Sequence, residues 1–383
     1  MAASNAAAIE KVHQLLTVPT PGTVPENPKP AALTDTQTEM LNQLIGHFSA
    51  PQFRPQERTL DGKGREMVQA GGPLTAWETC SLLNREALVR CLRADKWDLA
   101  KCQARIEETI IWRRSLGGDG IEIEEQAAII KNEAKTGKMF TLGFDNIGRP
   151  IVHMRPRHQT KGSSNSRFPL AFWLIDRAID LMPPGVESIL LVIDLAGPQE
   201  SPSVKQQKDF VKHLLPQTLG AHYCERLGQA LVANMPTLFV WVLKLLKPVI
   251  DPVTFAKAVV DKADPLKFAP AEQLDSPAGG TNGYDFDIDS YWPALTAECS
   301  RRRNARLDAW VKHGKTVGSS ELDGLSIDSR PSSPVSDSSA SSASTTSVYI
   351  SPSTISTPSA PANSSSCNLS TISHDPAPVT ISL

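Results

Sequence analysis

The chain has 383 residues, of which 39 are Lys or Arg and 41 are Asp or Glu, and its formal net charge is −2. This length is enough for one or two folded domains, and the balanced charge argues against a general attraction to nucleic acid. The six cysteines form no C-x-x-C pair, which argues against a disulfide framework or a structural zinc site and indicates reduced thiols.

Residues 1–70 are expected to form a flexible leader with some helix, because residues 18–35 are rich in proline and small residues. The first residues lack the basic and continuous apolar stretches of a secretory signal. No run reaches the roughly 18 apolar residues that a membrane span needs. We therefore expect a soluble, cytoplasmic protein.

A small helical module is expected at residues 71–135. Apolar side chains recur at helical spacing over residues 78–114, and Asp98 suits an N-cap. The pattern therefore predicts two helices that are separated around residues 94–97.

Residues 136–300 are expected to form a second, larger lobe. Four apolar or β-prone segments predict strands, at 138–145, 149–154, 188–195 and 229–234. Three segments with helical spacing follow or separate them, at 168–182, 204–215 and 238–246. The alternation indicates an α/β fold with a mainly parallel sheet and helical crossovers, preceded by the all-α module.

The carboxyl-terminal part is expected to be a helix and connector at residues 301–325, followed by a disordered tail at residues 326–383. The tail is rich in Ser, Thr and Pro and lacks the large apolar residues whose burial offsets backbone ordering. Its Ser-Pro and Thr-Pro pairs are either phosphorylation sites or incidental features of a solvated tail.

The common catalytic motifs are missing from the sequence. G-x-S-x-G, H-E-x-x-H and the phosphate-binding G-x-x-x-x-G-K-[ST] do not occur. His153 and His158 have no acidic neighbour and are expected to be structural or surface histidines, and Asp194 is expected to cap the turn after its strand. We therefore expect a binding protein that is not an enzyme and needs no metal or cofactor.

The helix expected at residues 238–246 is unusually apolar and contains Phe239, Trp241 and Leu245. One interpretation is that it covers the sheet. The other is that it lies on a bilayer and moves. The residues alone favour the first interpretation.

Four segments, in order, resemble motifs of the CRAL-TRIO lipid-binding family. They are LVRCLRADKWD (88–98), DNIGRPIV (145–152), HYCERLG (222–228) and LLKPVIDPVTFAK (245–257). Within the family, the chain resembles the fungal phosphatidylinositol-transfer proteins. The stretches AIDLMPPGVESILLVIDL and DIDSYWPAL resemble the pleiotropic drug resistance branch of that group.

The resemblance implies a helical amino-terminal unit packed on an α/β lobe whose sheet floors a lipid pocket closed by a helical gate. It implies that Glu225 meets the inositol hydroxyls, that Thr254 and Lys257 meet the phosphate, and that Lys96 adds a basic contact. The residues that it assigns to the pocket and gate are Ile189, Leu191, Phe239, Trp241, Leu245 and Val249.

The chain departs from the family pattern at several positions, of which Asp95 and four strand positions bear on the ligands. Asp95 stands where an arginine is common, and it would weaken anion binding unless it turned to solvent or paired with Lys96. Cys224 stands where the H-Y-P-E-R-L-G signature has proline. The family's choline-lipid contacts use hydroxyl groups, and the corresponding positions here are Ile189, Leu191, Thr141 and Val152. We therefore predict that the second ligand is a neutral, sterol-like lipid and not phosphatidylcholine.

The predicted function is exchange of phosphatidylinositol and a second hydrophobic lipid between membranes, with transient contact to the membrane surface and no covalent chemistry. The alternative is a lipid-sensing adaptor that regulates phosphoinositide metabolism, with the tail binding a kinase or trafficking partner. In either case we expect a peripheral protein of the endoplasmic reticulum, lipid droplet or Golgi surface that binds no nucleic acid.

Overall fold

The computed structural model describes residues 2–19, 32–60, 66–115, 123–158, 170–197, 220–235, 256–260 and 264–322. The chain divides into two units, of which the second comprises Asp328–Pro378. Every described residue lies in the first unit.

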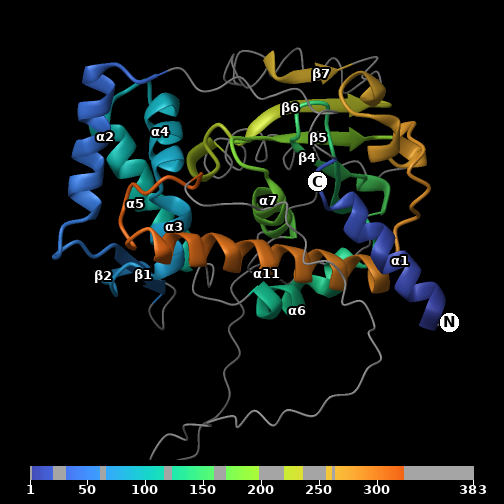
Figure 1. Cartoon of the computed structure of the whole chain (residues 1–383), viewed down its shortest axis with the longest axis horizontal. Coiled ribbons are helices and arrows are strands. Elements are labelled where there is room, and N and C mark those ends of the chain that lie inside the picture. Colours follow the sequence, from blue (N-terminus) through green and yellow to red (C-terminus); the bar gives the residue numbers. More distant parts are fainter. Residues whose placement is uncertain are drawn as a thin grey trace, which may run out of the picture. The chain divides into compact units, whose positions relative to one another are not determined.

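A five-stranded sheet forms the centre of the lobe (Figure 1). Its strands follow one another in chain order: β3 (Met139–Phe144), β4 (Pro150–Met154), β5 (Ile189–Asp194), β6 (Leu227–Ala233) and β7 (Ala258–Val260). The first two are antiparallel and the others are parallel. The prediction of an α/β fold with a mainly parallel sheet is confirmed, although the short strand β7 was not foreseen.

The two faces of the sheet are covered differently. On one face, α7 (Leu170–Leu181) and α11 (Ile288–Lys312) pack together, and their indoles Trp173 and Trp292 stack with ring centroids 4.7 Å apart. On the other face, Ile151, Leu190 and Leu231 are buried beneath residues 264–280, which contain short 3-10 turns. The sheet therefore has both faces in contact with protein, as the continuous apolar runs of its strands indicate.

The segment expected as a flexible leader carries regular structure. Its elements are α1 (Ala2–Leu15), α2 (Asp35–Phe48) and an antiparallel hairpin of β1 (Gln56–Leu60) with β2 (Glu66–Ala70). Val12, Leu15 and Leu16 are buried in the main core against α11, because their spacing places them on one helix face. Residues 20–31, which include much of the proline-rich stretch, lie outside the described residues.

The helical module consists of α3 (Ala76–Leu82), α4 (Arg85–Ala94), α5 (Leu99–Ser115) and α6 (Ile123–Ala134). The predicted break at 94–97 is present, and Asp98 Oδ1 accepts a hydrogen bond from the Lys101 backbone N–H at 3.1 Å. A further break at Asn84 was not predicted. Its side chain caps α4 by accepting from the Ala87 N–H at 2.7 Å.

The remaining predicted elements of the lobe have mixed outcomes. The helix predicted at 168–182 and the strands predicted at 188–195 and 229–234 correspond to α7, β5 and β6. The helices predicted at 204–215 and 238–246, and the tail at 326–383, lie outside the described residues. The carboxyl-terminal helix α11 begins at Ile288, so it runs through the expected boundary at residue 300.

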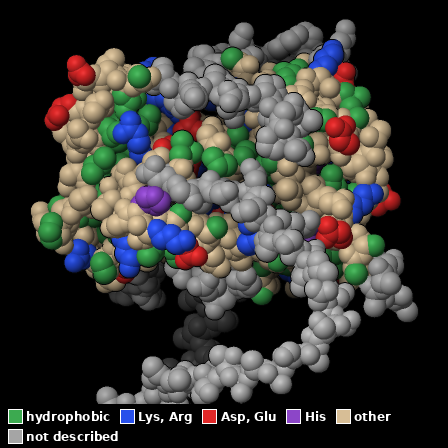
Figure 2. Space-filling view, viewed as in Figure 1, with side chains coloured by type: hydrophobic (Ala, Val, Ile, Leu, Met, Phe, Trp, Pro, Cys, Tyr) green, Lys and Arg blue, Asp and Glu red, His purple; other side chains and the backbone are tan. Residues whose placement is uncertain are grey.

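Charged side chains are interspersed on the face of the molecule seen in Figure 2, where Lys and Arg alternate with Asp and Glu among the described residues. Within the described part of the chain, no helix has the length and apolar character needed to span a bilayer.

Candidate functional site

Glu225 and Lys257, which lie 32 residues apart in the sequence, form an ion pair at one end of the sheet. Lys257 Nζ donates to Glu225 Oε2 at 3.3 Å. Each residue precedes a strand, Glu225 before β6 and Lys257 before β7, and these two strands are parallel neighbours. Because the parallel strands β6 and β7 begin at the same edge of the sheet, the acidic Glu225 and the basic Lys257 lie side by side there. Their side chains are 40% and 23% exposed, so both can reach a ligand.

The other residues assigned to the headgroup and gate are placed less completely. Lys96 is exposed and has a left-handed backbone, with φ of 54°, between α4 and α5. Among the described residues, Glu225 forms its ion pair with Lys257 and not with Lys96. The remaining positions lie outside the described residues: Thr254, Phe239, Trp241, Leu245 and Val249.

The strand positions that distinguish this chain from choline-lipid binders lie on one face of the sheet. Thr141 pairs with Val152 across β3 and β4, and Val152 pairs with Leu191 across β4 and β5. Ile189 lies two residues before Leu191 and so points to the same face. The hydroxyl of Thr141 is fully buried and donates to the Ile151 carbonyl at 3.1 Å. Thr141, Val152 and Ile189 are buried and Leu191 is half-buried, so these four positions supply three aliphatic side chains and no spare hydroxyl donor.

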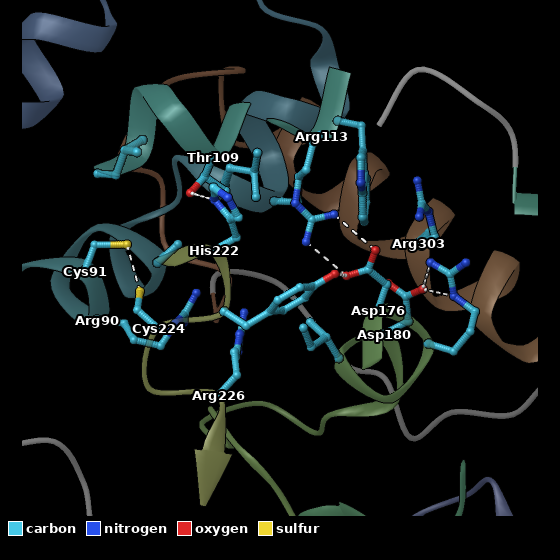
Figure 3. Close-up of a pocket in the computed structure, with 18 residues that line it drawn as sticks. Arg90, Cys91, Thr109, Arg113, Asp176, Asp180, His222, Cys224, Arg226 and Arg303 are labelled. Atoms are coloured by element: carbon cyan, nitrogen blue, oxygen red, sulfur yellow. Dashed lines mark hydrogen bonds and ion pairs between the residues drawn. The ribbon is translucent and has the colours of Figure 1, made fainter. Parts of the chain in front are cut away.

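His222, the first residue of the HYCERLG segment, contacts the helical module. Its ring stacks on Trp112 of α5 with centroids 4.3 Å apart, and its Nδ1 lies 3.0 Å from Thr109 Oγ1 (Figure 3). Burial, together with the nearby guanidinium groups of Arg113 and Arg105, lowers the pKa of His222 to about 4. The imidazole is therefore neutral at physiological pH and acts as a packing and hydrogen-bonding group.

Tyr223 extends the same contact into the lobe. Its hydroxyl donates to Asp176 Oδ1 of α7 at 3.1 Å, and Arg113 of α5 donates to both oxygens of that carboxylate at 2.9 and 3.1 Å. Burial alone would raise the pKa of Asp176, but the charge and hydrogen bonds of Arg113 hold it below its usual value. The carboxylate therefore stays ionised and joins the module to the lobe.

Asp95 is held by an arginine that neither alternative in the sequence analysis included. Arg105 of α5 donates to both carboxylate oxygens of Asp95 at 2.7 Å and also to the carbonyl oxygens of Gly220 and Ala221. Asp95 thus does not turn to solvent or pair with Lys96. Because its charge is matched by Arg105, it opposes a bound phosphate less than an unpaired carboxylate would.

The end of the HYCERLG segment turns into the lobe. Arg226 is half-buried and donates to the Glu187 carbonyl oxygen at 3.0 Å. Burial and the neighbouring charge of Arg90 lower the pKa of Arg226 to about 9. A Cβ at Gly228 would lie 2.4 Å from Arg149 Nη1 and 2.6 Å from Ser188 Oγ, so a side chain at this position would displace both of these groups. The segment therefore presents Glu225 to solvent while its neighbours fasten two parts of the fold together.

Two small cavities lie where α3 and α4 meet the lobe and α11. Their volumes are about 80 and 60 Å³. The larger is lined by side chains from α4, α5, α7 and the HYCERLG segment (Figure 3), among them Arg90, Cys91, Asp176, Cys224 and Arg226. Both are far below the roughly 300 Å³ at which small-molecule pockets begin, so neither is the predicted lipid pocket. No group of three potential metal ligands occurs among the described residues.

The contacts made by α5 were missed in the sequence analysis. Arg105, Thr109 and Arg113 follow one another at intervals of four and so share one helix face, and all three meet residues of the lobe. A polar stripe on an otherwise amphipathic helix was the available signal. It indicates that this face meets polar groups, but not which ones.

Comparisons with known proteins fit this arrangement. Residues 134–280 match the family model of the CRAL/TRIO domain. A CRAL-TRIO domain-containing protein of Schizosaccharomyces pombe, C23B6.04c, is 38% identical over 244 residues, which cover 63% of this chain and 23% of that protein. Phosphatidylinositol transfer protein PDR17 of Saccharomyces cerevisiae is 29% identical over 299 residues, which cover 76% of this chain and 84% of that protein.

Two further similarities were found. Phosphatidylinositol transfer protein CSR1 of Eremothecium gossypii is 30% identical over 215 residues, 52% of this chain and 48% of that protein. The crystal structure of Sfh5 aligns with a TM-score of 0.45 and 15% identity, over 67% of this chain and 91% of that chain. The aligned part of the chain thus spans 23% of the length of the S. pombe relative and 48% of the length of CSR1.

Proposed function

Because residues 134–280 match the family model of the CRAL/TRIO domain, we propose that the protein binds phosphatidylinositol and transfers it between membranes. The observation that carries the proposal is the Glu225–Lys257 pair, which stands partly exposed where β6 and β7 begin. Two relatives that are named phosphatidylinositol transfer proteins support it.

The pair suits an inositol phosphate headgroup. A carboxylate accepts hydrogen bonds from ring hydroxyls, and an ammonium group donates to phosphate oxygens. Ion pairs at this level of exposure contribute only about 0–1 kcal/mol, so little is lost when the two side chains turn from each other to a ligand. In this proposal Glu225 and Lys257 select the headgroup, with Thr254 and Lys96 as additional phosphate contacts.

Affinity comes mainly from the acyl chains. Burial of apolar surface contributes about 25 cal/mol per Å², so two enclosed chains outweigh a few headgroup contacts. The apolar face that includes Leu191 supports this role, since Leu191 is only half-buried. We propose that the segment at 238–249 docks on the bilayer and opens, and that one lipid leaves as another enters.

Replacing Lys257 or Glu225 by alanine is expected to slow phosphatidylinositol transfer between vesicles about tenfold or more, because a charge-assisted hydrogen bond contributes about 1.5–3 kcal/mol. The measurement is the transfer rate of fluorescent phosphatidylinositol between donor and acceptor vesicles. Lys101→Ala is the matched control, since Lys101 also pairs with an acid but is 72% exposed on α5. Wild-type transfer by both site variants would reject this headgroup site.

The charge-swapped double variant Glu225→Lys, Lys257→Glu separates binding from folding. It keeps an ion pair at this position but exchanges the donor and the acceptor that the headgroup meets. We expect it to unfold at the wild-type urea concentration and still to transfer phosphatidylinositol poorly. Recovery of transfer would mean that the pair acts only through the fold.

The second ligand is proposed to be a neutral, sterol-like lipid. Support comes from the aliphatic positions Val152, Ile189 and Leu191 and from the fully engaged hydroxyl of Thr141. A phosphocholine group beside them would lose its hydrogen bonds to water without gaining donors from these residues.

We therefore expect excess unlabelled sterol in the vesicles to inhibit phosphatidylinositol transfer more strongly than the same excess of phosphatidylcholine. Competition by each lipid in vesicles of otherwise equal composition is the measurement. Equal competition, or extraction of phosphatidylcholine by the purified protein, would contradict this choice of ligand.

A further inference from the structure

Two cysteines from separate parts of the fold are in direct contact. Cys91 on α4 and Cys224 in the HYCERLG segment have their Sγ atoms 3.3 Å apart, although they lie 133 residues apart in the sequence (Figure 3). Both are free thiols in the structure. A disulfide has an S–S distance of about 2.05 Å, so the two sulfur atoms have to approach each other by about 1.2 Å to form one.

The surroundings of this thiol pair favour the thiolate of Cys224. The Cys91 thiol donates a hydrogen bond to it and, although burial opposes ionisation, the charges of Arg90, Arg105 and Arg226 add to the effect and lower the pKa of Cys224 to about 7. A substantial fraction of Cys224 is therefore ionised at neutral pH, and the thiolate is the form that reacts with oxidants.

Arg90 is placed to act on this sulfur. Its side chain is only 7% exposed, and among the described residues its Nε and Nη1 atoms have no hydrogen-bond partner. The nearest carboxylate oxygen, that of Glu187, lies 3.8 Å from Nη1, and Glu187 is also bound by Arg93. A buried guanidinium without a complete set of partners is costly, and an anionic sulfur nearby reduces that cost.

The other described cysteines provide an internal contrast. Burial raises the pKa of Cys80 to about 11 and that of Cys102 to about 12, and it also raises the pKa of Cys299. These three thiols are protonated at physiological pH and are expected to be unreactive. The arrangement at Cys224 is therefore not a general property of this protein's cysteines.

A small oxidant has room to approach the thiol pair. Both cysteines line the cavity of about 80 Å³, which also contains Arg90 and Arg226. This volume suits a molecule of the size of hydrogen peroxide but excludes bulky oxidised thiols such as glutathione disulfide. The cavity thus selects the class of oxidant by size.

We propose that Cys224 and Cys91 form a peroxide-sensitive pair whose disulfide links the helical module to the lobe. In the first step the Cys224 thiolate attacks one peroxide oxygen, the O–O bond breaks, and hydroxide leaves and takes up a proton to give water. Cys224 is then a sulfenic acid. In the second step the Cys91 sulfur attacks the Cys224 sulfur, the S–O bond breaks, and the departing hydroxide combines with the Cys91 proton to give a second water.

The disulfide would affect the headgroup site, a consequence that rests on the proposed function. Glu225 follows Cys224 directly and has a left-handed backbone, with φ of 58°. A covalent link from the preceding residue to α4 restricts the turn that positions this carboxylate. We therefore expect oxidation to slow lipid exchange, and reduction by dithiothreitol to restore it.

The test uses the full chain with Cys367→Ser, which removes the cysteine of the tail. The protein is treated with a slight excess of hydrogen peroxide, remaining thiols are alkylated, and the product is analysed by intact mass and peptide mapping. We expect loss of two hydrogen atoms and a peptide that joins Cys91 to Cys224. Cys80→Ser should form the same link, whereas Cys224→Ser should not, and Cys91→Ser should accumulate a sulfenic acid at Cys224.

Oxidation of Cys80, Cys102 or Cys299 as fast as Cys224 would overturn the proposal. So would Cys91 and Cys224 thiols that remain alkylatable under conditions that oxidise a model thiol, or over-oxidation of Cys224 without a link. Cys224→Pro, which has the residue of the H-Y-P-E-R-L-G signature, is the control for transfer, and peroxide should not slow it. If the reduced wild type transfers no phosphatidylinositol while the link still forms, the proposed function fails and the thiol chemistry stands.

Discussion

Replacing Asp180 by alanine is expected to lower the free energy of unfolding by about 3–5 kcal/mol, because it leaves the Arg177 charge buried without its counter-ion. Asp180 Oδ2 accepts from Arg177 Nε at 2.9 Å and lies 2.8 Å from Nη2. The two side chains are only 4% and 1% exposed. Both belong to α7, and Arg306 of α11 also lies 3.7 Å from Asp180, so the loss affects the packing of these two helices.

Urea unfolding followed by circular dichroism measures this effect, with Lys101→Ala as a control in an exposed ion pair that is expected to show no measurable change. The double variant Arg177→Met, Asp180→Leu removes both charges and replaces them with apolar side chains. We expect it to be more stable than Asp180→Ala alone, because no buried charge remains. A double variant that is less stable than the single one would show that Arg177 stabilises the fold through other contacts, such as the one with the Trp173 ring.

Strand β5 and the hairpin of β3 and β4 were predictable because they depend on local patterns. The run at 188–195 is apolar except for Ser188 and Asp194, and it forms a strand with neighbouring strands on both sides and protein on both faces. The hairpin at 138–154 was signalled by its turn, where Asp145 accepts from the Ile147 and Arg149 N–H groups. Where local chemistry and burial agree, a single sequence is sufficient.

Elements that depend on distant partners were not predictable in the same way. The burial of α1 requires α11, which begins at Ile288, and nothing near Val12 or Leu16 in the sequence reveals that partner. The break at Asn84 lies inside a run with helical spacing. It becomes favourable because the Asn84 side chain also reaches the Cys80 carbonyl at 3.0 Å.

In the candidate site, too, some contacts could be predicted from the sequence and others could not. Only the resemblance to a family indicated that Glu225 and Lys257 belong to one site. Their sequence spacing of 32 residues does not by itself predict a contact. The pairing of Asp95 with Arg105 was missed, because an acid at the end of one helix can be matched from any face that packs against it. Tertiary packing decides which polar groups meet.

The HYCERLG segment combines two roles that its sequence does not separate. His222 faces the helical module, and Tyr223 lies between Trp112 of the module and Asp176 of the lobe. Arg226 donates to a carbonyl oxygen of the lobe, and Glu225 is turned to Lys257. A rigid attachment on one side therefore positions the carboxylate on the other. This arrangement makes the headgroup site sensitive to changes at the contact between module and lobe.

Acidification from pH 7 to pH 5 is expected to lower the free energy of unfolding by about 2 kcal/mol for each of His153 and His222. Burial is the main reason that the pKa of each is about 4 in the folded protein, against 6.5 for a free histidine. Between these values the unfolded chain binds protons that the folded protein does not. The stability that neutral histidine provides is therefore fully present above pH 6.5 and is lost as the pH falls toward 4.

Replacing His222 by glutamine should remove about half of this dependence, because the remaining loss belongs to His153. Urea unfolding at pH 7, 6 and 5 measures it, and pH 5 is high enough that carboxylates with lowered pKa values, such as Asp176 and Glu298, stay ionised. His13→Gln on α1 serves as the control. If the free energy of unfolding of the His222 variant depended on pH as strongly as that of the wild type, the His222 imidazole would take up a proton in the folded protein. A neutral ring stacked on Trp112 would then not explain how the HYCERLG segment holds the helical module.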